Sequence, residues 1–415
     1  MTLATDTNLI NADLIPSLQG PPHELFHAWR ATDPVHWNPA PDDYTAPMPG
    51  ASVSQGFWVL TRYDDVWKVS RNQLLFSSHV GSPVIWDFEP EQLAMQQANF
   101  MGMEPEQHLQ VKRLVMPPFS AAELKAFEPE IAEVAKEIVD EIIDQGECEF
   151  VFDVASKLPV YTFCKLLGVP EKYKDRVYVL GNKVADTENP NRADEGQDTL
   201  FELFSIAQEV VADKRENPDN SMMSRLVHGE LDGEKLDDMQ LNMFFLTLAI
   251  AGHETTRGTA THFLRLMAEY PDQYELLRSD PDKYIPNAID EVLRFSPPVI
   301  KFRRTATQDT KLGDKDIKEG DKVYLSYPAA NRDPDVFENP DVFDITRENA
   351  GKHLAFGTGQ HVCLGARLAH IQLFHLLKEI VTRMPDFELM GEPTFLRSIW
   401  FNAVINMPIK WTPPE

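Results

Sequence analysis

The segment FGTGQHVCLG, residues 356–365, constrains the fold of this chain more than any other short stretch. It places three glycines around Cys363, one of only three cysteines in 415 residues. Glycine lets a bulky group approach the thiol closely, and its backbone can bend so that N–H groups point at the sulfur. The next residues, LGARLAHIQLFHLLKEIV, carry a helical apolar stripe, so Cys363 is predicted at a helix N-terminus, where the dipole stabilises a thiolate. The pattern predicts a thiolate metal ligand under a flat cofactor.

Other readings of this segment explain less. A zinc site would need a second paired ligand set with the usual spacing, which the chain lacks, and its candidate ligands would be His353, His361, Cys363 and His370. A dinucleotide site would need the glycines to follow a strand, whereas they follow a predicted loop. A simple turn into a helix leaves Phe356, His361 and Arg367 without a role. The other cysteines, Cys148 and Cys164, are predicted to be ordinary packing or surface thiols.

Composition limits the function classes. Acidic residues outnumber basic ones by 65 to 39, so the surface repels nucleic acid and anionic membranes. The odd number of cysteines fits a reducing compartment. The N-terminus lacks the pattern of a signal peptide, and no stretch offers the ~20 uninterrupted apolar residues of a membrane span. We expect a cytoplasmic protein with no membrane anchor and no nucleic-acid partner.

Helical patterns dominate the chain. One helix is predicted after Ser120, with a capping box at Ser120 and Glu123 and a stop at Gly146. Strands are expected at 57–61 and 321–327. Without repeats or linkers, residues 1–415 are expected to form one mainly α domain with a small β-rich region. The helical part is expected mainly within 105–295 and 364–385, the β-rich part mainly within 30–80 and 300–415, and mobile loops at 79–107 and 186–199.

The stretch FFLTLAIAGHETTRGTATHFLRLM is a second unusual feature. It is an apolar helix interrupted by Glu254, Thr255 and Thr256, and such polar groups in mid-helix are costly unless they are used. We expect the Thr255 hydroxyl to donate to the carbonyl of Ala251, which bends the helix and opens a groove beside Gly252. A solvated polar stripe on an amphipathic helix is the alternative for this pattern in isolation.

The segment FGTGQHVCLGARLAH resembles the haem-binding signature of the cytochrome P450 superfamily, a highly specific motif. The resemblance implies a cytochrome P450 fold, with Cys363 as the axial thiolate of the haem iron and His361 bonded to a haem propionate. The haem-binding loop would also include Phe356, Gly357 and Gly365. The apolar helix resembles the superfamily's oxygen-binding helix, which implies that Ala251 lies beside the haem. Glu254 and Thr255 would then handle the protons consumed in oxygen activation.

Three further motifs extend the resemblance. In IDEVLRFSPP, Glu291 and Arg294 would alone read as a surface ion pair, but they match the superfamily's E-x-x-R motif, which Arg347 completes as a buried structural network. FRRTATQD resembles the segment whose arginine reaches the haem edge, which favours Arg304 over Arg303. MEPEQHLQVKRL resembles the H-x-x-x-R helix. It supplies His108, with Lys112 where arginine is usual, and loses the bidentate geometry of arginine.

What the resemblance implies chemically is monooxygenation, with haem b as cofactor and O2 as co-substrate. Because the chain has no reductase domain, electrons would come from a separate ferredoxin and ferredoxin reductase, and the enzyme would act as a monomer. An acidic ferredoxin would need a local basic patch, for which the candidates are Lys112, Arg113, Lys352, His361 and Arg367. The alternatives are a peroxide-driven relative, which usually lacks the acid–alcohol pair, and a non-catalytic haem-binding or sensor protein.

The substrate is expected to be a lipophilic small molecule. The segments FRRTATQDTKLGDKDIKEGDKVYLSYPAANRD and LRSIWFNAVIN look closest to the bacterial subgroup that hydroxylates sterol side chains, branched lipids, terpenoids and alkanes. By positional resemblance the pocket above the haem would be apolar, although each of its residues could equally be a core residue. The residues expected to line it are Thr247, Ile250, Ala251, Val299, Ile300, Trp400 and Phe401.

Overall fold

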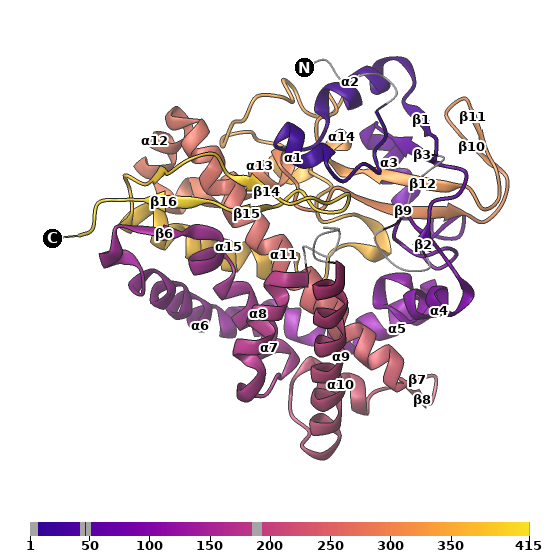
Figure 1. Ribbon diagram of the computed structural model, residues 1–415, viewed down its shortest axis with the longest axis horizontal. Helices are drawn as coiled ribbons and strands as arrows, with labels where there is room; N and C mark the ends of the chain where they lie inside the picture. Colours follow the sequence, from indigo (N-terminus) through magenta and orange to yellow (C-terminus); the bar gives the residue numbers. More distant parts are fainter. Residues whose placement is uncertain (1–6, 42–45, 47–50, 185–192, 415) are drawn as a thin grey trace.

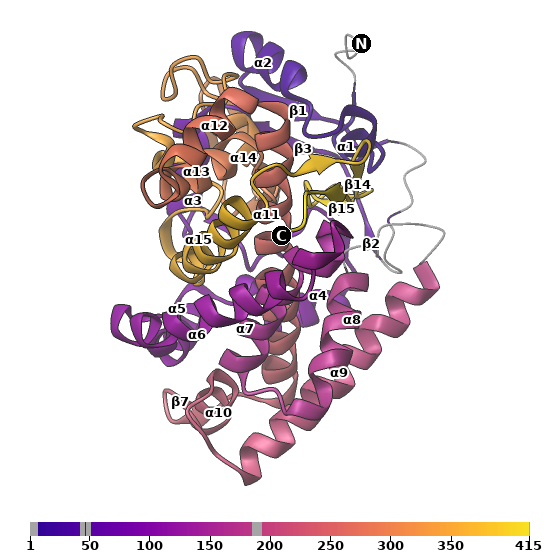
Figure 2. The same cartoon turned by 90° about the vertical axis from the view of Figure 1, so that its left-hand side faces the viewer.

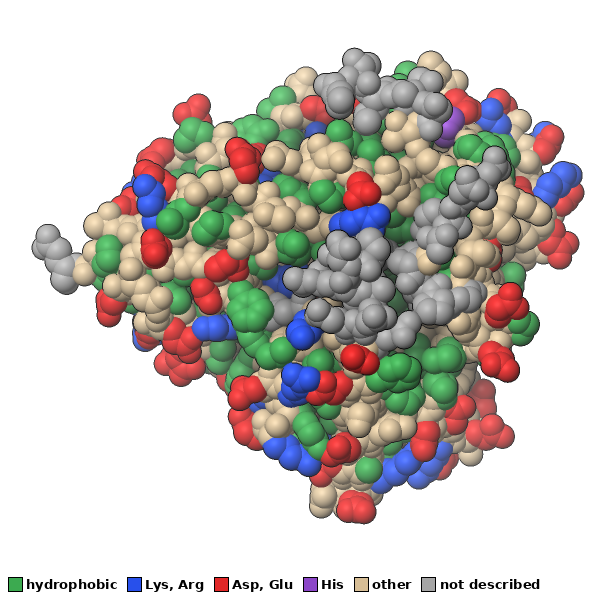
Figure 3. All heavy atoms as spheres, in the orientation of Figure 1, with side chains coloured by type: hydrophobic (Ala, Val, Ile, Leu, Met, Phe, Trp, Pro, Cys, Tyr) green, Lys and Arg blue, Asp and Glu red, His purple; other side chains and the backbone are tan. Residues whose placement is uncertain are grey.

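The computed structural model describes residues 7–41, 46, 51–184 and 193–414. Figure 1 shows a roughly triangular outline, with the strands of the main sheet at one corner and helices α6 to α10 along the opposite side. Figure 3 shows acidic side chains spread over this face with basic ones interspersed, as a formal net charge of −26 requires. Within the described residues, no helix is long and apolar enough to cross a bilayer.

The helices carry most of the fold, so the mainly α class predicted from the sequence is confirmed. They are α1 (Leu14–Leu18), α2 (His23–Thr32), α3 (Tyr63–Arg71), α4 (Pro90–Ala98), α5 (Pro105–Val115), α6 (Ala121–Asp140), α7 (Lys157–Leu167), α8 (Lys174–Val184), α9 (Ala193–Glu216), α10 (Met222–His228), α11 (Asp238–Glu269), α12 (Pro271–Ser279), α13 (Pro281–Phe295), α14 (Tyr327–Ala330) and α15 (Ala366–Arg383).

The main sheet joins segments from both halves of the chain. Its order is β1 (Val35–Asn38), β3 (Phe57–Leu60), β12 (Lys322–Ser326), β9 (Lys301–Ala306) and β4 (Phe76–Ser77). Only the β3–β12 pair is parallel. Strands β3 and β12 confirm the two strands predicted from the sequence. The sheet therefore ties the segment before the haem-binding motif to the N-terminal third of the chain.

The remaining strands form four two-stranded sheets and one three-stranded sheet in the described part of the chain. They are β2 (Ala51–Ser52) with β5 (Asp87–Phe88), β7 (Glu230–Leu231) with β8 (Glu234–Lys235), β10 (Thr310–Leu312) with β11 (Lys315–Ile317), β14 (Thr394–Phe395) with β15 (Val404–Asn406), and the three-stranded set β13 (Glu388–Leu389), β16 (Pro408–Lys410) and β6 (Glu147–Glu149).

Helix α11 is the central element of the fold. Its start is fixed by a capping box between Asp237 and Gln240. Most of its residues are buried, because core side chains pack against it from several directions, and this is what an all-round apolar helix requires. In Figure 2 it runs through the body of the molecule between α15 on one side and α8 and α9 on the other. The helix that carries the polar interruption therefore lies in the interior.

Three local expectations need correction. Residues 79–107 are not the irregular loop that was predicted, because they contain β5, α4 and a short 3-10 turn. Helix α4 buries none of its residues, so the sequence shows no apolar stripe there. Of the predicted loop at 186–199, residues up to 192 lie outside the described residues and the remainder begins α9. The Ser120 hydroxyl accepts from the Glu123 N–H, which is one of the two bonds of the predicted capping box, but the helix ends at Asp140, before the left-handed Gly146.

Candidate functional site

The loop around Cys363 is shaped by backbone contacts and two left-handed glycines. The Cys363 N–H donates to the carbonyl of Phe356 at 2.8 Å, which closes the loop just before α15. Gly357 has φ +66° and Gly359 has φ +75°, conformations that side chains rarely allow. A Cβ on Gly359 would also lie 3.0 Å from the Ser70 carbonyl oxygen of α3. Gly359 therefore lets the loop pack on α3, and only Gly357 of this pair faces the cavity.

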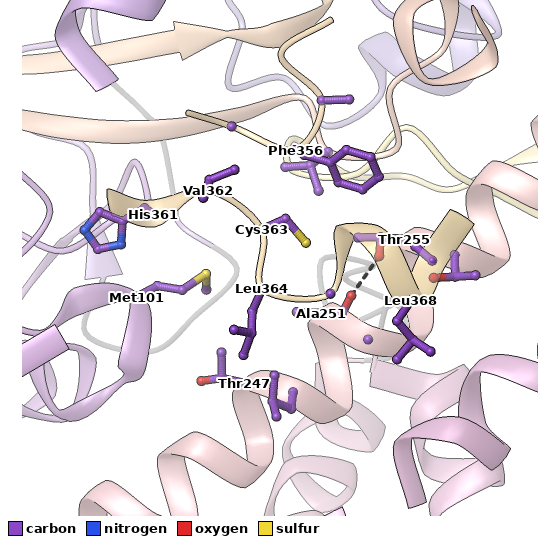
Figure 4. Close-up of a pocket in the computed structure, with 18 of the residues that line it drawn as sticks. Met101, Thr247, Ala251, Thr255, Phe356, His361, Val362, Cys363, Leu364 and Leu368 are labelled. Carbon is purple, nitrogen blue, oxygen red and sulfur yellow. Dashed lines mark hydrogen bonds between the residues drawn. The ribbon is translucent and has the colours of Figure 1, made fainter. Parts of the chain in front are cut away.

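The pKa of the Cys363 thiol is raised overall, so the stabilised thiolate expected from the sequence stays a prediction. Burial raises the pKa of the thiol, whereas the backbone N–H groups of Gly365 and Ala366 and the Lys112 ammonium act to lower it. Figure 4 shows the sulfur pointing into a cavity, with Thr255 and Ala251 of α11 beyond it. A positively charged metal ion at the sulfur would complete the stabilisation of a thiolate.

Helix α11 forms the facing wall of this cavity. The Thr255 hydroxyl donates to the Ala251 carbonyl at 2.8 Å, which confirms the predicted bond and is drawn in Figure 4. A Cβ on Gly252 would meet no heavy atom within 4 Å, so open space lies beside it. Thr247, Ala251 and Thr255 all line the cavity, because residues four apart share one helix face. This face has room for a small ligand next to a hydroxyl.

Glu254 lies off that face and is buried with a cation of its own helix. Its side chain is 1% exposed, and Arg257, 3% exposed, forms an ion pair with it. His253 is also buried, with its Nδ1 3.9 Å from a carboxylate oxygen of Glu254. Burial raises the pKa of Glu254, although Arg257 opposes the shift. The acid next to Thr255 is therefore enclosed by protein and does not line the cavity.

Basic side chains gather at one edge of the cavity. His108 and His361 lie with ring centroids 4.3 Å apart, and both line the cavity with Arg304. Arg304 is buried, and its Nε has no hydrogen-bond partner. Burial lowers the pKa of His108 to about 4, with Lys112 and Arg304 adding to the effect, and the pKa of His361 is lowered for the same kinds of reason. No carboxylate among the described residues acts on the pKa of these three side chains, so within that part of the chain no carboxylate balances the cluster.

These residues fit a haem group. A haem carries two carboxylates, and the uncompensated cluster of Arg304, His108 and His361 supplies donors for them. The rest of the wall is mostly apolar and includes Phe100, Phe302 and Leu368, which suits a flat hydrophobic ring. Cys363 offers the one thiol that faces this cavity among the described residues. The site therefore defines a haem-thiolate protein.

Lys112 has a partner on the cysteine loop itself. Its ammonium donates to the carbonyl of Gln360 at 2.7 Å, and the Gln360 side chain lies 3.1 Å from His108 Nδ1. Lys112 is absent from the cavity lining within the described residues. It braces α5 against the cysteine loop, whereas Arg113, next in the sequence, is exposed.

Glu291, Arg294 and Arg347 come together away from the cavity. Arg294 binds both oxygens of Glu291, at 2.7 and 2.8 Å, and the Arg347 Nε lies 3.2 Å from the same carboxylate. Glu291 and Arg294 are both 0% exposed. The two guanidinium groups also donate to backbone carbonyls of residues 331–342. The network anchors the irregular segment that precedes the cysteine loop.

The structure collects most, though not all, of the predicted site residues around the cavity. Those that line it are His108, Thr247, Ala251, Thr255, Val299, Arg304, Phe356, Gly357, His361, Cys363 and Gly365. Ile300 lies in the hydrophobic core, and Trp400 packs edge-on against Phe302. Neither they nor Ile250 and Phe401 line the cavity in the described part of the chain. The aromatic lining missed from the sequence consists of Phe100, Phe119, Phe163, Phe302 and Tyr327.

Comparison with known proteins extends this assignment over the whole chain. The family model "Cytochrome P450" matches residues 189–390. A steroid C26-monooxygenase of Rhodococcus jostii is 34% identical over 92% of this chain and 80% of its own length. A linalool 8-monooxygenase of Pseudomonas putida is 32% identical over 98% of this chain and 99% of its own. A Mycobacterium marinum cytochrome P450 in complex with pseudoionone superposes with a TM-score of 0.88 at 32% identity, covering 98% and 97% of the two chains.

The chain belongs to the cytochrome P450 family. The structural match confirms the cytochrome P450 fold predicted from the motifs. The family and the names of the relatives make it a haem-thiolate monooxygenase that uses O2.

Proposed function

We propose that this enzyme hydroxylates a lipophilic, weakly functionalised molecule of the steroid, terpenoid, fatty acid or alkane type. One observation carries the proposal: Cys363 at the start of α15 faces Thr255 on α11 across a cavity with a mostly apolar wall. The wall offers few polar side chains to recognise a highly functionalised substrate, and burial of apolar surface would supply most of the affinity. The relatives named for steroid and linalool oxidation act on molecules of this kind.

Cofactor binding is assigned to residues at the cavity edge. Cys363 would hold the iron of a haem b, while His108, Arg304 and His361 would bind its propionates. Phe356, Gly357 and Gly365 would contact the ring, and Lys112 would act through the Gln360 carbonyl. When bound, the haem would supply oxygen activation and transfer of an oxygen atom to the substrate, assisted by electron donation from the thiolate.

Proton handling is assigned to Thr255 and Glu254. The Thr255 hydroxyl lines the cavity beside the open space at Gly252 and would position a donor or a water molecule there. Glu254 has a raised pKa because it is buried, so it can hold a proton at its carboxylate when the pair with Arg257 opens. This acid–alcohol pair favours electron-driven oxygen activation over a peroxide-driven reaction.

The spectrum of the reduced protein under carbon monoxide tests the cofactor assignment. We expect the far-red-shifted Soret band of thiolate-ligated haem, and its absence from protein that contains haem would refute the assignment. Steroids, terpenoids, fatty acids and alkanes are then added to the oxidised protein, because a substrate that displaces a water ligand shifts the Soret band. We expect saturable shifts with at least one of these classes; binding only of polar, highly functionalised compounds would contradict the substrate proposal.

Electrons are proposed to come from a separate ferredoxin with its reductase. Arg113, Lys352 and Arg367 are exposed on the segments around the cysteine loop. Reversal of Arg113 to Glu should therefore slow reduction by an acidic ferredoxin far more than it weakens substrate binding, and the loss should shrink at high salt. Stopped-flow reduction and substrate titration measure the two effects. Equal effects on both, or none on reduction, would contradict docking at this face.

Lys112 is a less suitable probe of docking. Its ammonium braces the cysteine loop through the Gln360 carbonyl, so Lys112→Glu should also disturb the haem environment. We expect a changed Soret band in Lys112→Glu and an unchanged one in Arg113→Glu, which separates bracing from docking.

A further inference from the structure

A histidine–aspartate–histidine cluster lies behind the cysteine loop, and the functions assigned above do not use it. Asp290 is on α13, His353 follows the short 3-10 turn η7 (Ala350–Lys352), and His370 is on α15. Asp290 Oδ1 lies 2.7 Å from His370 Nε2 and 3.4 Å from His353 Nε2. His353 is 3% exposed, while His370 and Asp290 are 33% and 26% exposed. The cluster therefore joins three elements at the edge of solvent.

Hydrogen-bond geometry fixes the charge of each histidine. His370 Nδ1 lies 2.9 Å from the Ala366 carbonyl, and its Nε2 faces the Asp290 carboxylate. A carbonyl and an ionised carboxylate can only accept, so with Asp290 ionised both nitrogens of His370 carry hydrogen and the ring is a cation. His353 Nδ1 accepts from the Ala355 N–H at 3.2 Å, so this ring is neutral and donates from Nε2. The cluster thus holds one cation, one anion and one neutral ring.

The electrostatics agree with this reading. Burial alone would lower the pKa of His370, but hydrogen bonds to Asp290 and the Ala366 carbonyl, with the charge of Asp290, raise it overall. Burial would raise the pKa of Asp290, but the hydrogen bonds from His353 and His370 hold it well below its usual range. Of the other charged groups on these elements, Glu291 pairs with Arg294 and Arg347, His375 with Glu128, and Lys378 with Asp282, whereas Lys352 and Arg367 are exposed to solvent.

The rings of His353 and His370 also pack against Phe356, the first residue of the cysteine loop. The Phe356 ring centroid lies 5.5 Å from that of His353 and 5.4 Å from that of His370. Phe356 lines the cavity beside Cys363, and its carbonyl accepts the Cys363 N–H. Phe356 therefore connects the two histidine rings directly to the backbone N–H of Cys363. No three His, Cys, Asp or Glu side chains in the described residues are arranged to bind a metal ion, so a metal-binding role is not supported.

We infer that His370 and Asp290, with His353, form a positioning site that fixes Phe356 and sets the charge on the thiolate side of the haem. The inference rests on the proposed assignment of Cys363 as the haem ligand. Reduction of the haem would add a negative charge near the cluster. When His370 is a cation it balances the charge of Asp290, so the cluster should oppose reduction less than when His370 is neutral. As the pH rises through the raised pKa of His370, the cation is lost, and the equilibrium constant for reduction should fall by about two- to fivefold.

Midpoint potentials of the holoenzyme between about pH 6 and pH 10 test this inference. In the wild type we expect the equilibrium constant for reduction to fall across the titration of His370. His370→Gln should show the low value at every pH, because Asp290 stays uncompensated. His370→Arg, which keeps the cation, should show the high value throughout. His375→Gln on the same helix is the matched control, since His375 pairs with Glu128 away from Phe356, and it should follow the wild type.

The outcomes separate the two proposals. Lack of a thiolate-type Soret band in the wild type would refute the haem assignment itself. With that band present, a wild-type pH profile in His370→Arg would overturn the inference, whatever the behaviour of His370→Gln. Should His370→Gln fail to bind haem, His370→Arg and Asp290→Asn decide. Asp290→Asn removes the hydrogen bond and the charge that raise the pKa of His370, so the fall should move to lower pH, and a fall at the same pH as in the wild type would equally overturn the inference.

Discussion

Glu291→Gln is expected to lower the free energy of unfolding by about 3–5 kcal/mol, the usual cost of removing one partner from a buried ion pair. Glu291 and Arg294 are fully buried, and the carboxylate also binds Arg347 and the Asp344 N–H. Glutamine keeps the volume but leaves two guanidinium groups without a counter-charge. Urea unfolding of the holoenzyme, followed by circular dichroism and the Soret band, measures the change.

Glu128→Gln is the matched control for that substitution. Its carboxylate pairs with His375 at 3.0 Å but is 42% exposed, so its loss should cost less than about 1 kcal/mol. If Glu291→Gln unfolds at the same urea concentration as the wild type, the network is not the anchor of the segment before the cysteine loop. If both variants are equally destabilised, the effect is not specific to buried charge.

The local chemistry of the cysteine loop could be predicted because its signals are local. Glycines with positive φ, a following helical stripe and a lone thiol lie within a few residues of one another, so the sequence displays them together. The Thr255–Ala251 bond is predictable for the same reason, since a hydroxyl four residues after a carbonyl can reach it on any helix. By contrast, helix α4 could not be found, because it has no buried face to create a pattern.

Which residues of α11 line the cavity depends on the register of the helix. Thr247, Ala251 and Thr255 are four residues apart and line the cavity. Ile250 and Glu254 each precede one of these positions and do not line it. Pro298 and Val299 line the cavity, whereas Ile300 lies in the hydrophobic core. Positional resemblance to the family predicts which segments lie at the cavity, but it does not predict which residues of each segment face it. The aromatic lining comes from α7, β9, α14 and the short 3-10 turns on either side of α5, and it depends on long-range packing that no local pattern reports.

The ion-pair partner of Glu254 could have been predicted from the sequence. Arg257 follows three residues later in the same apolar helix, a spacing that brings opposite charges together. The burial of both groups could be read only from the fold, because it depends on the helices that cover α11. That burial matters for function, since a solvent-exposed glutamate would be ionised at neutral pH and a buried one can keep its proton.

Thr255→Val and Glu254→Gln are expected to reduce oxygen-dependent hydroxylation by about 100-fold or more, the size of a general acid–base contribution. Thr255→Val removes the hydroxyl that lines the cavity, and Glu254→Gln removes the neighbouring buried carboxyl group, which is proposed to hold a proton. Neither change alters Cys363 or the basic cluster of His108, Arg304 and His361, so the reduced carbon-monoxide spectrum should be unchanged. The measurement is the amount of product formed per electron pair consumed. In both variants we expect hydrogen peroxide to be released in place of product.

Peroxide-supported turnover separates proton handling from a general loss of structure. Peroxide already supplies two reducing equivalents and two protons, so both variants should keep most of this activity if they act only on proton handling. Thr261→Val is the matched control, because Thr261 also donates to a carbonyl of α11, at 2.8 Å, but lies away from the cavity. It should hydroxylate like the wild type. Full oxygen-dependent activity in Glu254→Gln and Thr255→Val would assign the chemistry to a different proton source, and equal loss with peroxide would indicate a damaged haem site.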